Sequence, residues 1–339
     1  MTAPRRPRGP RRLLLALVGC LLAATVGACA PPAPQVSSAA AAPEDKQTQT
    51  QRTEPPYDIR PLLHPDHKYL GVAVNGSPRA TAPLTAFTEK AGKRPDLREY
   101  YAKWGDPFQP EVNRAVWDNG QLPFLVWEPF SRTVAQIAAG KDDAYIRKFA
   151  DAVRDYNRPL ALSFGHEMNG GWYPWGGRKT KAADFARAWR HIHDLFRDEG
   201  AADVIWVWSP NVINPVPDVR LKPYYPGDAY VDWIGVVGYY ALSGPTSFRT
   251  LFGPTLTEIR RFSRKPFIVA ETGVEAGERK PAEITDLFAG VRARDDVLGL
   301  VWFNLKKEAD WRIDSGPLSL AAFREAAADD SFGFDVRKP

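Results

Sequence analysis

Two glutamates, Glu167 and Glu271, follow closely on short apolar runs at residues 159–164 and 266–270. Hydrolysis of a glycosidic bond needs two carboxyl groups. One protonates the leaving oxygen, and the other attacks the anomeric carbon or activates water. A single glutamate in such a place is more often part of a structural salt bridge. Two of them, with tryptophan and tyrosine nearby, favour the hydrolytic chemistry.

The chain holds 11 tryptophans, many of them at the ends of apolar runs. A flat indole ring offers an apolar face on which the C–H face of a sugar packs. Buried structural tryptophans are the alternative interpretation. The segments after three further runs carry aromatic or amide groups: Trp208-Ser209-Pro210-Asn211, Gly238-Tyr239-Tyr240 and Trp302-Phe303-Asn304.

Short apolar runs alternate with amphipathic stretches along the chain. Strands are expected at 69–74, 97–103, 122–127, 159–164, 203–208, 231–237, 266–270 and 297–303, and helices at 143–156, 182–199, 247–262 and 282–294. This alternation predicts right-handed βαβ units and a parallel sheet. Eight units over about 280 residues fit a single-domain (β/α)8 TIM barrel, an α/β fold.

A doubly wound open sheet is the alternative fold. Such a sheet usually shows a glycine-rich phosphate turn after an early strand. The first expected strand instead leads into Ala73-Val74-Asn75-Gly76-Ser77-Pro78. The barrel is therefore favoured, and its active groups are expected at the carboxyl ends of the strands.

The run His166-Glu167-Met168-Asn169-Gly170-Gly171-Trp172-Tyr173-Pro174-Trp175 resembles glycoside hydrolase family 26, which contains β-mannanases and mixed-linkage β-glucanases. Weaker pieces follow in the same order as in the family: residues 206–211, 225–228, 232–235, the turn at Glu271 and residues 302–312. The resemblance covers about residues 66–325. It implies a retaining, endo-acting hydrolase of a β-linked polysaccharide on a (β/α)8 barrel.

The resemblance also implies roles for individual residues. Glu167 would be the general acid/base and Glu271 the nucleophile, with Tyr239 hydrogen-bonded to the nucleophile. The remaining substrate-binding positions would be His166 and Asn169 near the cleavage point, Trp302 as the platform under the sugar, and Trp172, Trp175 and Trp208 in neighbouring subsites.

The third expected strand ends differently from that of the mannan-cleaving members, which carry a sugar-binding histidine there. Here it ends in Val126-Trp127-Glu128-Pro129, which is closer to the members acting on mixed-linkage β-glucan. Glu128 is then either a substrate contact or a carboxylate behind one. Both interpretations, and both substrates, stay open.

The charge pattern gives no support for a nucleic-acid partner. The formal net charge of +5 is carried by five arginines within residues 1–28, and the rest of the chain is neutral. A zinc-protease motif at His166-Glu167 would need a second histidine at position 170, which is Gly170. No metal and no cofactor are expected, and the protein is expected to be a monomer.

Residues 1–28 are predicted to be an export signal, because a basic stretch precedes an apolar run at residues 13–26. Cys29 closes Val26-Gly27-Ala28-Cys29, which resembles a bacterial lipobox and predicts lipidation of Cys29; a plain secretory signal is the alternative. Residues 29–57 are expected to be a disordered tether, and residues 58–339 the catalytic domain. The protein would then be extracellular, anchored to the outer face of the membrane through its lipid alone.

A second hypothesis from a different class is a non-catalytic, surface-anchored polysaccharide-binding protein on a barrel scaffold. Aromatic subsites alone would fit it. A barrel that has lost its activity commonly loses at least one of the two carboxylates, and this chain retains both. A reducing-sugar assay separates the two hypotheses.

Overall fold

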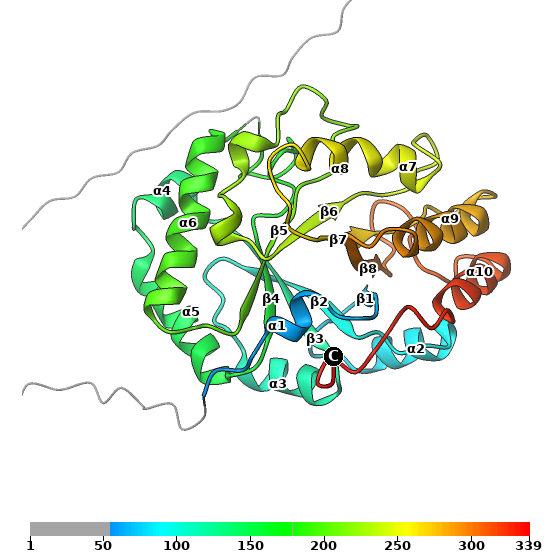
Figure 1. Ribbon diagram of the computed structural model, residues 1–339, viewed down its shortest axis with the longest axis horizontal. Coiled ribbons are helices and arrows are strands. Elements are labelled where there is room, and N and C mark those ends of the chain that lie inside the picture. Colours follow the sequence, from blue (N-terminus) through cyan, green and yellow to red (C-terminus); the bar gives the residue numbers. More distant parts are fainter. Residues whose placement is uncertain (1–54, 178) are drawn as a thin grey trace, which may run out of the picture. The chain divides into compact units, whose positions relative to one another are not determined.

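A computed structural model describes residues 55–177 and 179–339, and eight parallel strands of this part close into one barrel (Figure 1). The predicted strands are all present, with ends displaced by at most two residues: β1 Tyr69–Ala73, β2 Leu97–Lys103, β3 Leu122–Glu128, β4 Leu160–Phe164, β5 Val204–Trp208, β6 Trp233–Val237, β7 Phe267–Thr272 and β8 Val297–Phe303. β1 pairs with β8, which closes the barrel. The predicted TIM barrel is confirmed.

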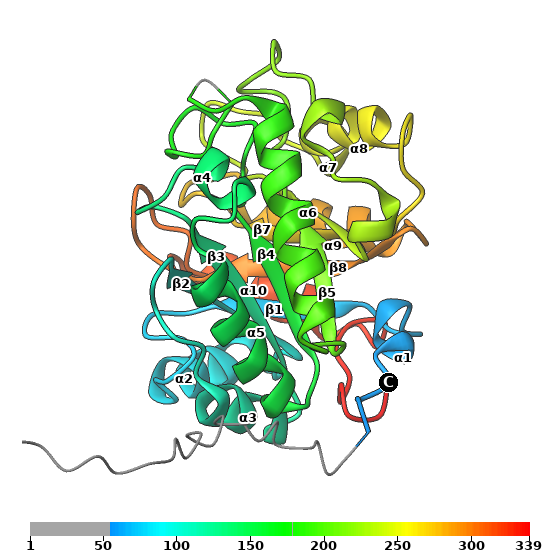
Figure 2. The ribbon, with the colours of Figure 1, turned by 90° about the vertical axis from the view of Figure 1, so that its left-hand side faces the viewer.

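Helices cover the outside of the barrel: α1 Arg60–Leu63, α2 Ala82–Ala91, α3 Pro110–Asp118, α4 Val134–Ala138, α5 Asp143–Tyr156, α6 Ala182–Asp198, α7 Phe248–Leu251, α8 Gly253–Ile259, α9 Lys280–Arg292 and α10 Pro317–Ala327, with 3₁₀ turns η1 Lys222–Tyr224 and η2 Asp228–Tyr230. Figure 2 shows α5 and α6 side by side along the strands. The helix predicted at 247–262 is divided into α7 and α8, with Pro254 in the first turn of α8. Proline has no N–H to continue the helix before it.

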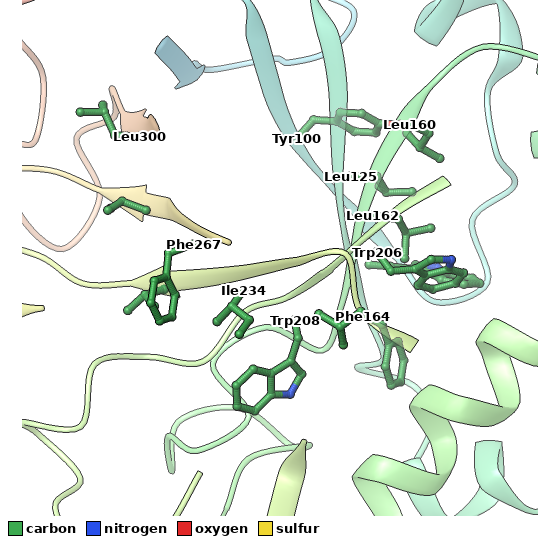
Figure 3. Packing of buried hydrophobic residues seen from close by; sticks show 14 of the residues in the cluster. Tyr100, Leu125, Leu160, Leu162, Phe164, Trp206, Trp208, Ile234, Phe267 and Leu300 are labelled. Carbon is green, nitrogen blue, oxygen red and sulfur yellow. The ribbon is translucent and has the colours of Figure 1, made fainter. Parts of the chain in front are cut away.

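Successive side chains along each strand point to opposite faces of the barrel wall. One set fills the interior, including Phe124, Ile205 and Val301. The other set packs outward against the helices. Phe164 of β4, for example, stacks on Phe185 of α6 with ring centroids 5.9 Å apart. Figure 3 shows part of this outer layer, including Phe164, Trp206, Trp208 and Ile234.

The amino-terminal end of the barrel is closed by α1 and the C-terminal tail. The Tyr69 hydroxyl donates to Leu62 O at 2.8 Å, and Trp233 Nε1 donates to Leu63 O at 3.2 Å. Asp96 accepts from the backbone N–H groups of Leu70 and Phe334 at 3.0 and 3.2 Å. The carboxyl ends of the strands therefore form the mouth.

The N-terminal predictions fall mostly outside the described residues. The signal at 1–28, Cys29 and tether residues 30–54 belong there. Tyr57, which the prediction assigns to the tether, packs edge-on against Trp117 with ring centroids 5.2 Å apart. Within residues 55–177 and 179–339, no helix is long and apolar enough to cross a membrane.

Candidate active site

Glu167 stands in a sharp turn directly after β4. Its φ of +54° and that of Gly165, +55°, lie in the left-handed region that side chains larger than glycine rarely adopt. The Glu167 N–H donates to Ser209 O beyond β5 at 2.6 Å and holds the turn in place. Such strained backbone is commonly found at functional sites, where the surrounding structure enforces it.

Two donors reach the Glu167 carboxyl: Trp172 Nε1 to Oε2 at 2.8 Å, and Asn211 Nδ2 to Oε1. Burial raises the pKa of Glu167 to about 7, and the charge of Glu271 adds to this increase. The two hydrogen bonds oppose the increase because they favour the ionised form. A carboxyl with this pKa still holds its proton in part near neutral pH.

Asn169 lies below the acid and positions Asn211. Asn169 Nδ2 donates to Asn211 O at 2.9 Å, and the Asn211 N–H donates to Asn169 Oδ1 at 2.8 Å. Asn169 is fully buried. The structure therefore places this predicted substrate contact behind Asn211, whose own amide reaches Glu167.

Glu271 reaches the mouth through an irregularity of β7. Val236 of β6 is paired with Val269, whereas the next residue, Val237, is paired with Glu271. Ala270 is thus the extra residue of a β-bulge. Ala270 packs in the barrel interior, so strict alternation would turn the Glu271 side chain outward. The bulge redirects it into the barrel mouth, as bulges next to active sites commonly do.

Two tyrosine hydroxyls donate to the Glu271 carboxylate: Tyr101 to Oε2 and Tyr239 to Oε1. Burial raises the pKa of Glu271, whereas the hydrogen bonds from the two hydroxyls lower it. The charge of Glu271 in turn raises the pKa of Glu167. The pair is therefore arranged to hold one carboxylate, Glu271, and one carboxylic acid, Glu167.

Both glutamates line one cavity of about 650 Å³ at the barrel mouth. Its lining is rich in aromatic and charged side chains: Tyr101, Glu128, Glu167, Trp172, Tyr173, Tyr239, Glu271, Phe303, Leu305, Lys307, Glu308 and Trp311. A second cavity of about 360 Å³ shares Trp172 and Tyr239 with the first. The two cavities therefore adjoin at Trp172 and Tyr239.

His166 is buried beside this cavity and does not line it. Its Nε2 lies 3.1 Å from the Tyr173 hydroxyl, and Tyr173 does line the cavity. Burial lowers the pKa of His166 to about 3, and the charge of Lys307 contributes to this decrease. The imidazole is therefore neutral, and its nearest route to a bound molecule is through Tyr173.

Of the four tryptophans predicted to line subsites, only one lies at the cavity. Trp172 lines both cavities and is 45% exposed. Trp208 and Trp302 are fully buried and belong to the outer layer of their strands, so their predicted places in subsites are corrected. Trp302 packs on Phe323 of α10 at 5.0 Å, and Trp208 packs on Tyr225 at the same separation. Strand alternation turns both rings away from the mouth.

Trp175 is also buried, so its predicted subsite place is corrected too. Its ring stacks on Tyr173 with centroids 4.5 Å apart, and Nε1 donates to His166 O at 2.7 Å. Trp175 therefore supports the loop after β4. It has no face open to the cavity.

Several residues that line the cavity or donate to the two glutamates were not predicted as site residues: Tyr101, Tyr173, Asn211, Phe303, Leu305, Lys307, Glu308 and Trp311. The indole of Trp311 lies against Tyr239 with ring centroids 4.7 Å apart. Trp311 lines the cavity, which Trp302 does not, and Trp302 Nε1 donates to Trp311 O at 3.0 Å. Alternation along β2 was a signal for Tyr101, because Leu97 and Tyr101 share the inward face. Asn211, Lys307 and Trp311 lie within segments 206–211 and 302–312, which carry the family resemblance, but no individual role was predicted for them.

Glu128 lies at the end of β3 and lines the main cavity. Burial raises its pKa to about 7, against the lowering effect of the nearby Lys307 charge. It is therefore placed for direct contact with a bound molecule. Within the described residues, no group of three or more His, Cys, Asp or Glu side chains could hold a metal ion.

Comparison with known proteins gives consistent matches. The sequence model described as "Glycosyl hydrolase family 26" matches residues 135–257. Endoglucanase H of Acetivibrio thermocellus is 34% identical over 272 residues, which are 76% of this chain and 30% of that protein. The catalytic domain of an endo-β-1,4-mannanase from Bacillus sp. is similar in fold, with a TM-score of 0.61, 18% identity and coverage of 79% and 87%.

The fold and the site define a (β/α)8 barrel with two paired, buried carboxyls at its mouth. By sequence the chain is similar to glycoside hydrolase family 26, and the solved structure shares its fold. It spans less than a third of the length of Endoglucanase H.

Proposed function

We propose that this protein is a retaining, endo-acting hydrolase of a β-linked polysaccharide that works by double displacement. The observation that carries the proposal is the pairing of Glu271, held by two tyrosine hydroxyls, with Glu167, whose pKa is raised to about 7. Glu271 would attack the anomeric carbon while Glu167 protonates the leaving oxygen. Glu167 would then act as the base for the water that hydrolyses the glycosyl ester.

The shape of the cleft supports internal cleavage of a chain. The adjoining cavity continues past Trp172 and Tyr239 toward Asn214 and Leu251. A polysaccharide would lie across Glu167 and Glu271 with sugars on both sides. A closed pocket that accepts only a chain end would instead favour exo action.

Among the candidate polysaccharides, a β-glucan is the better supported. Glu128 lines the cavity at the place where mannan-cleaving relatives are expected to carry a histidine. The relative matched over most of this chain is named an endoglucanase, whereas the mannan endo-1,4-β-mannosidase of Bacillus subtilis is 29% identical over 39% of the chain. We propose mixed-linkage β-glucan ahead of β-mannan.

The test is release of reducing ends by the purified protein from lichenan, mannan, glucomannan and xylan. Glu271→Ala serves as the matched inactive control. The highest kcat/KM is expected on lichenan, with a rapid fall in viscosity that marks internal cuts. A preference for mannan would overturn the substrate assignment. Binding without any hydrolysis would favour the non-catalytic binding protein.

We also propose that the protein is an exported, monomeric lipoprotein attached to the outer face of the membrane through Cys29. The lipobox-like Val26–Cys29 run and the polar composition of residues 30–54 support this. Mature protein should begin at Cys29 and partition with membranes, and Cys29→Ala should release it or stall its processing. An unmodified N-terminus downstream of residue 30, measured by intact mass, would contradict the anchor. Light scattering of the released domain tests the monomer.

A further inference from the structure

A third carboxyl, Glu99 on β2, lies below the nucleophile in the barrel interior. Its neighbour on the same face of β2 is Tyr101, two residues toward the mouth. Glu99 is 1% exposed, and its backbone is in register with Ala73 of β1 and Phe124 of β3. It does not line the cavity.

No basic side chain neutralises Glu99 within the described residues. The influences on it are burial, the negative charge of Glu271 and the Tyr101 hydroxyl, and its Oε2 has no hydrogen-bond partner. A buried carboxylate without a cation is costly, and such a group takes up a proton instead. Burial and the charge of Glu271 accordingly hold the pKa of Glu99 well above its usual range.

The Tyr101 hydroxyl acts on both carboxyls. It donates to Glu271 Oε2, and it also neighbours Glu99, where a donated hydrogen bond would lower the pKa of that carboxyl. A phenol has one proton to donate and lone pairs to accept. Since that proton is given to Glu271, Glu99 completes the contact only as a donor, which requires the neutral acid.

We propose that Glu99 is a positioning residue that remains a carboxylic acid and donates its proton to the Tyr101 oxygen, which strengthens the Tyr101 hydrogen bond to Glu271. Hydrogen bonds in a chain polarise one another, so a donor behind Tyr101 makes its own O–H a better donor. The inference rests on the proposed function because Glu271 is taken as the nucleophile.

Other titratable groups surround this chain of hydrogen bonds. Tyr239 and Glu271 face it from β6 and β7, and Glu167 acts on Tyr239 from beyond β4. Lys307 and Glu308 from the loop after β8 act on Glu271 in opposite directions. These groups are unchanged in the Glu99 variants. A difference in the pH profile between the variants therefore reports the relay, which is the pair of hydrogen bonds from Glu99 to Tyr101 and from Tyr101 to Glu271.

The test compares Glu99→Leu and Glu99→Gln in the full chain by kcat/KM against pH. Glu99→Leu removes the donor, so the apparent pKa of the acidic limb, where Glu271 must ionise, should rise by about one unit, which is ~1.4 kcal/mol. Activity on the acidic limb should therefore fall about tenfold. Glu99→Gln keeps a neutral N–H donor and should restore activity to within about threefold with the limb unmoved.

The direction of the shift decides between the protonated and ionised forms of Glu99. If Glu99 were a carboxylate, both variants would remove a negative charge and move the acidic limb to lower pH, which would overturn the proposal. The relay also predicts that Glu99→Leu has no further effect on the limb in a Tyr101→Phe background. A full shift in that background would overturn the role of Tyr101.

A measurement without turnover separates this inference from the proposed function. Carbon-13 NMR of glutamate carboxyls, with the Glu99 signal assigned by its loss in Glu99→Gln, should show Glu99 still protonated at pH values where the exposed glutamates have ionised. Titration near the ordinary value of about 4.3 would overturn the relay even in an active enzyme. An inactive protein with a protonated Glu99 would instead overturn the proposed function. Because this uses wild type and Glu99→Gln, it holds if Glu99→Leu does not fold.

Discussion

Trp172 Nε1 donates a hydrogen bond to Glu167 Oε2 at 2.8 Å from a side chain that is nearly half exposed at the rim of the cleft. Trp172 thus contacts Glu167 through its N–H and also lines both cavities with its aromatic ring. Its two effects separate in kinetics, because the hydrogen bond acts on a pKa and the ring acts on binding.

Trp172→Phe should move the basic limb of kcat/KM to higher pH. The Trp172 hydrogen bond lowers the pKa of Glu167 by favouring its ionised form. Without that bond, Glu167 keeps its proton to higher pH, and activity that falls above about pH 7 in the wild type persists further. Trp172→Ala, which also loses the ring, should raise KM in addition. A shift to lower pH would contradict this reading of the hydrogen bond.

Glu167→Ala should lower kcat on natural glycans by about 10²–10⁴-fold, the usual contribution of a general acid. Aryl glycosides with good leaving groups need no proton, so the first step should be nearly unaffected on them. Parallel assays on lichenan and an aryl glycoside measure the difference. Equal losses on both would argue against Glu167 as the acid.

Glu271→Ala should abolish turnover on every substrate, because good leaving groups do not bypass a missing nucleophile. For the wild type, direct attack requires the two carboxyl groups to lie about 5–5.5 Å apart and leaves the product in the β configuration. NMR of the first-formed sugar measures the anomer. An initial α-anomer would overturn the assignment of Glu271 as nucleophile.

Glu167→Gln should stabilise the protein above pH 7. The folded pKa of Glu167, about 7, exceeds the unfolded value of about 4.3. Between these values the folded state binds more protons, so its stability falls as pH rises, by on the order of 3 kcal/mol. Glutamine removes this loss. Thermal unfolding at pH 4 and pH 8 should show a gain for the variant only at pH 8; an equal gain at both would contradict the titration.

Trp302→Ala and Trp311→Ala should differ in kind. Trp302 is enclosed by the α10 layer, so its truncation should cost about 3–5 kcal/mol of unfolding free energy and leave the KM of the folded protein unchanged. Trp311 lines the cavity, so its truncation should raise KM. Denaturant unfolding and kinetics on lichenan give both quantities. A raised KM for Trp302→Ala at unchanged stability would instead support the predicted role of Trp302 as the platform under the sugar.

The barrel, its strand limits and the two carboxyls could be predicted from the chain. A strand buried on both faces appears in the sequence as a short continuous apolar run, and the turn around Glu167 lies within the single run His166–Trp175. The family resemblance predicted a hydrogen bond from Tyr239 to Glu271, and the structure contains it.

Which tryptophans line the cavity could be read only from the folded structure. The face taken by each strand residue depends on register, and a shift of one residue turns Trp302 from platform to core. The bulge at Ala270 shows the same dependence, since it turns Glu271 inward against simple alternation. Asn211, Lys307 and Trp311 belong to loops, whose paths depend on contacts with residues distant in the sequence. The unpartnered Oε2 of Glu99 could be recognised only in the structure, where Tyr101 contacts Glu271.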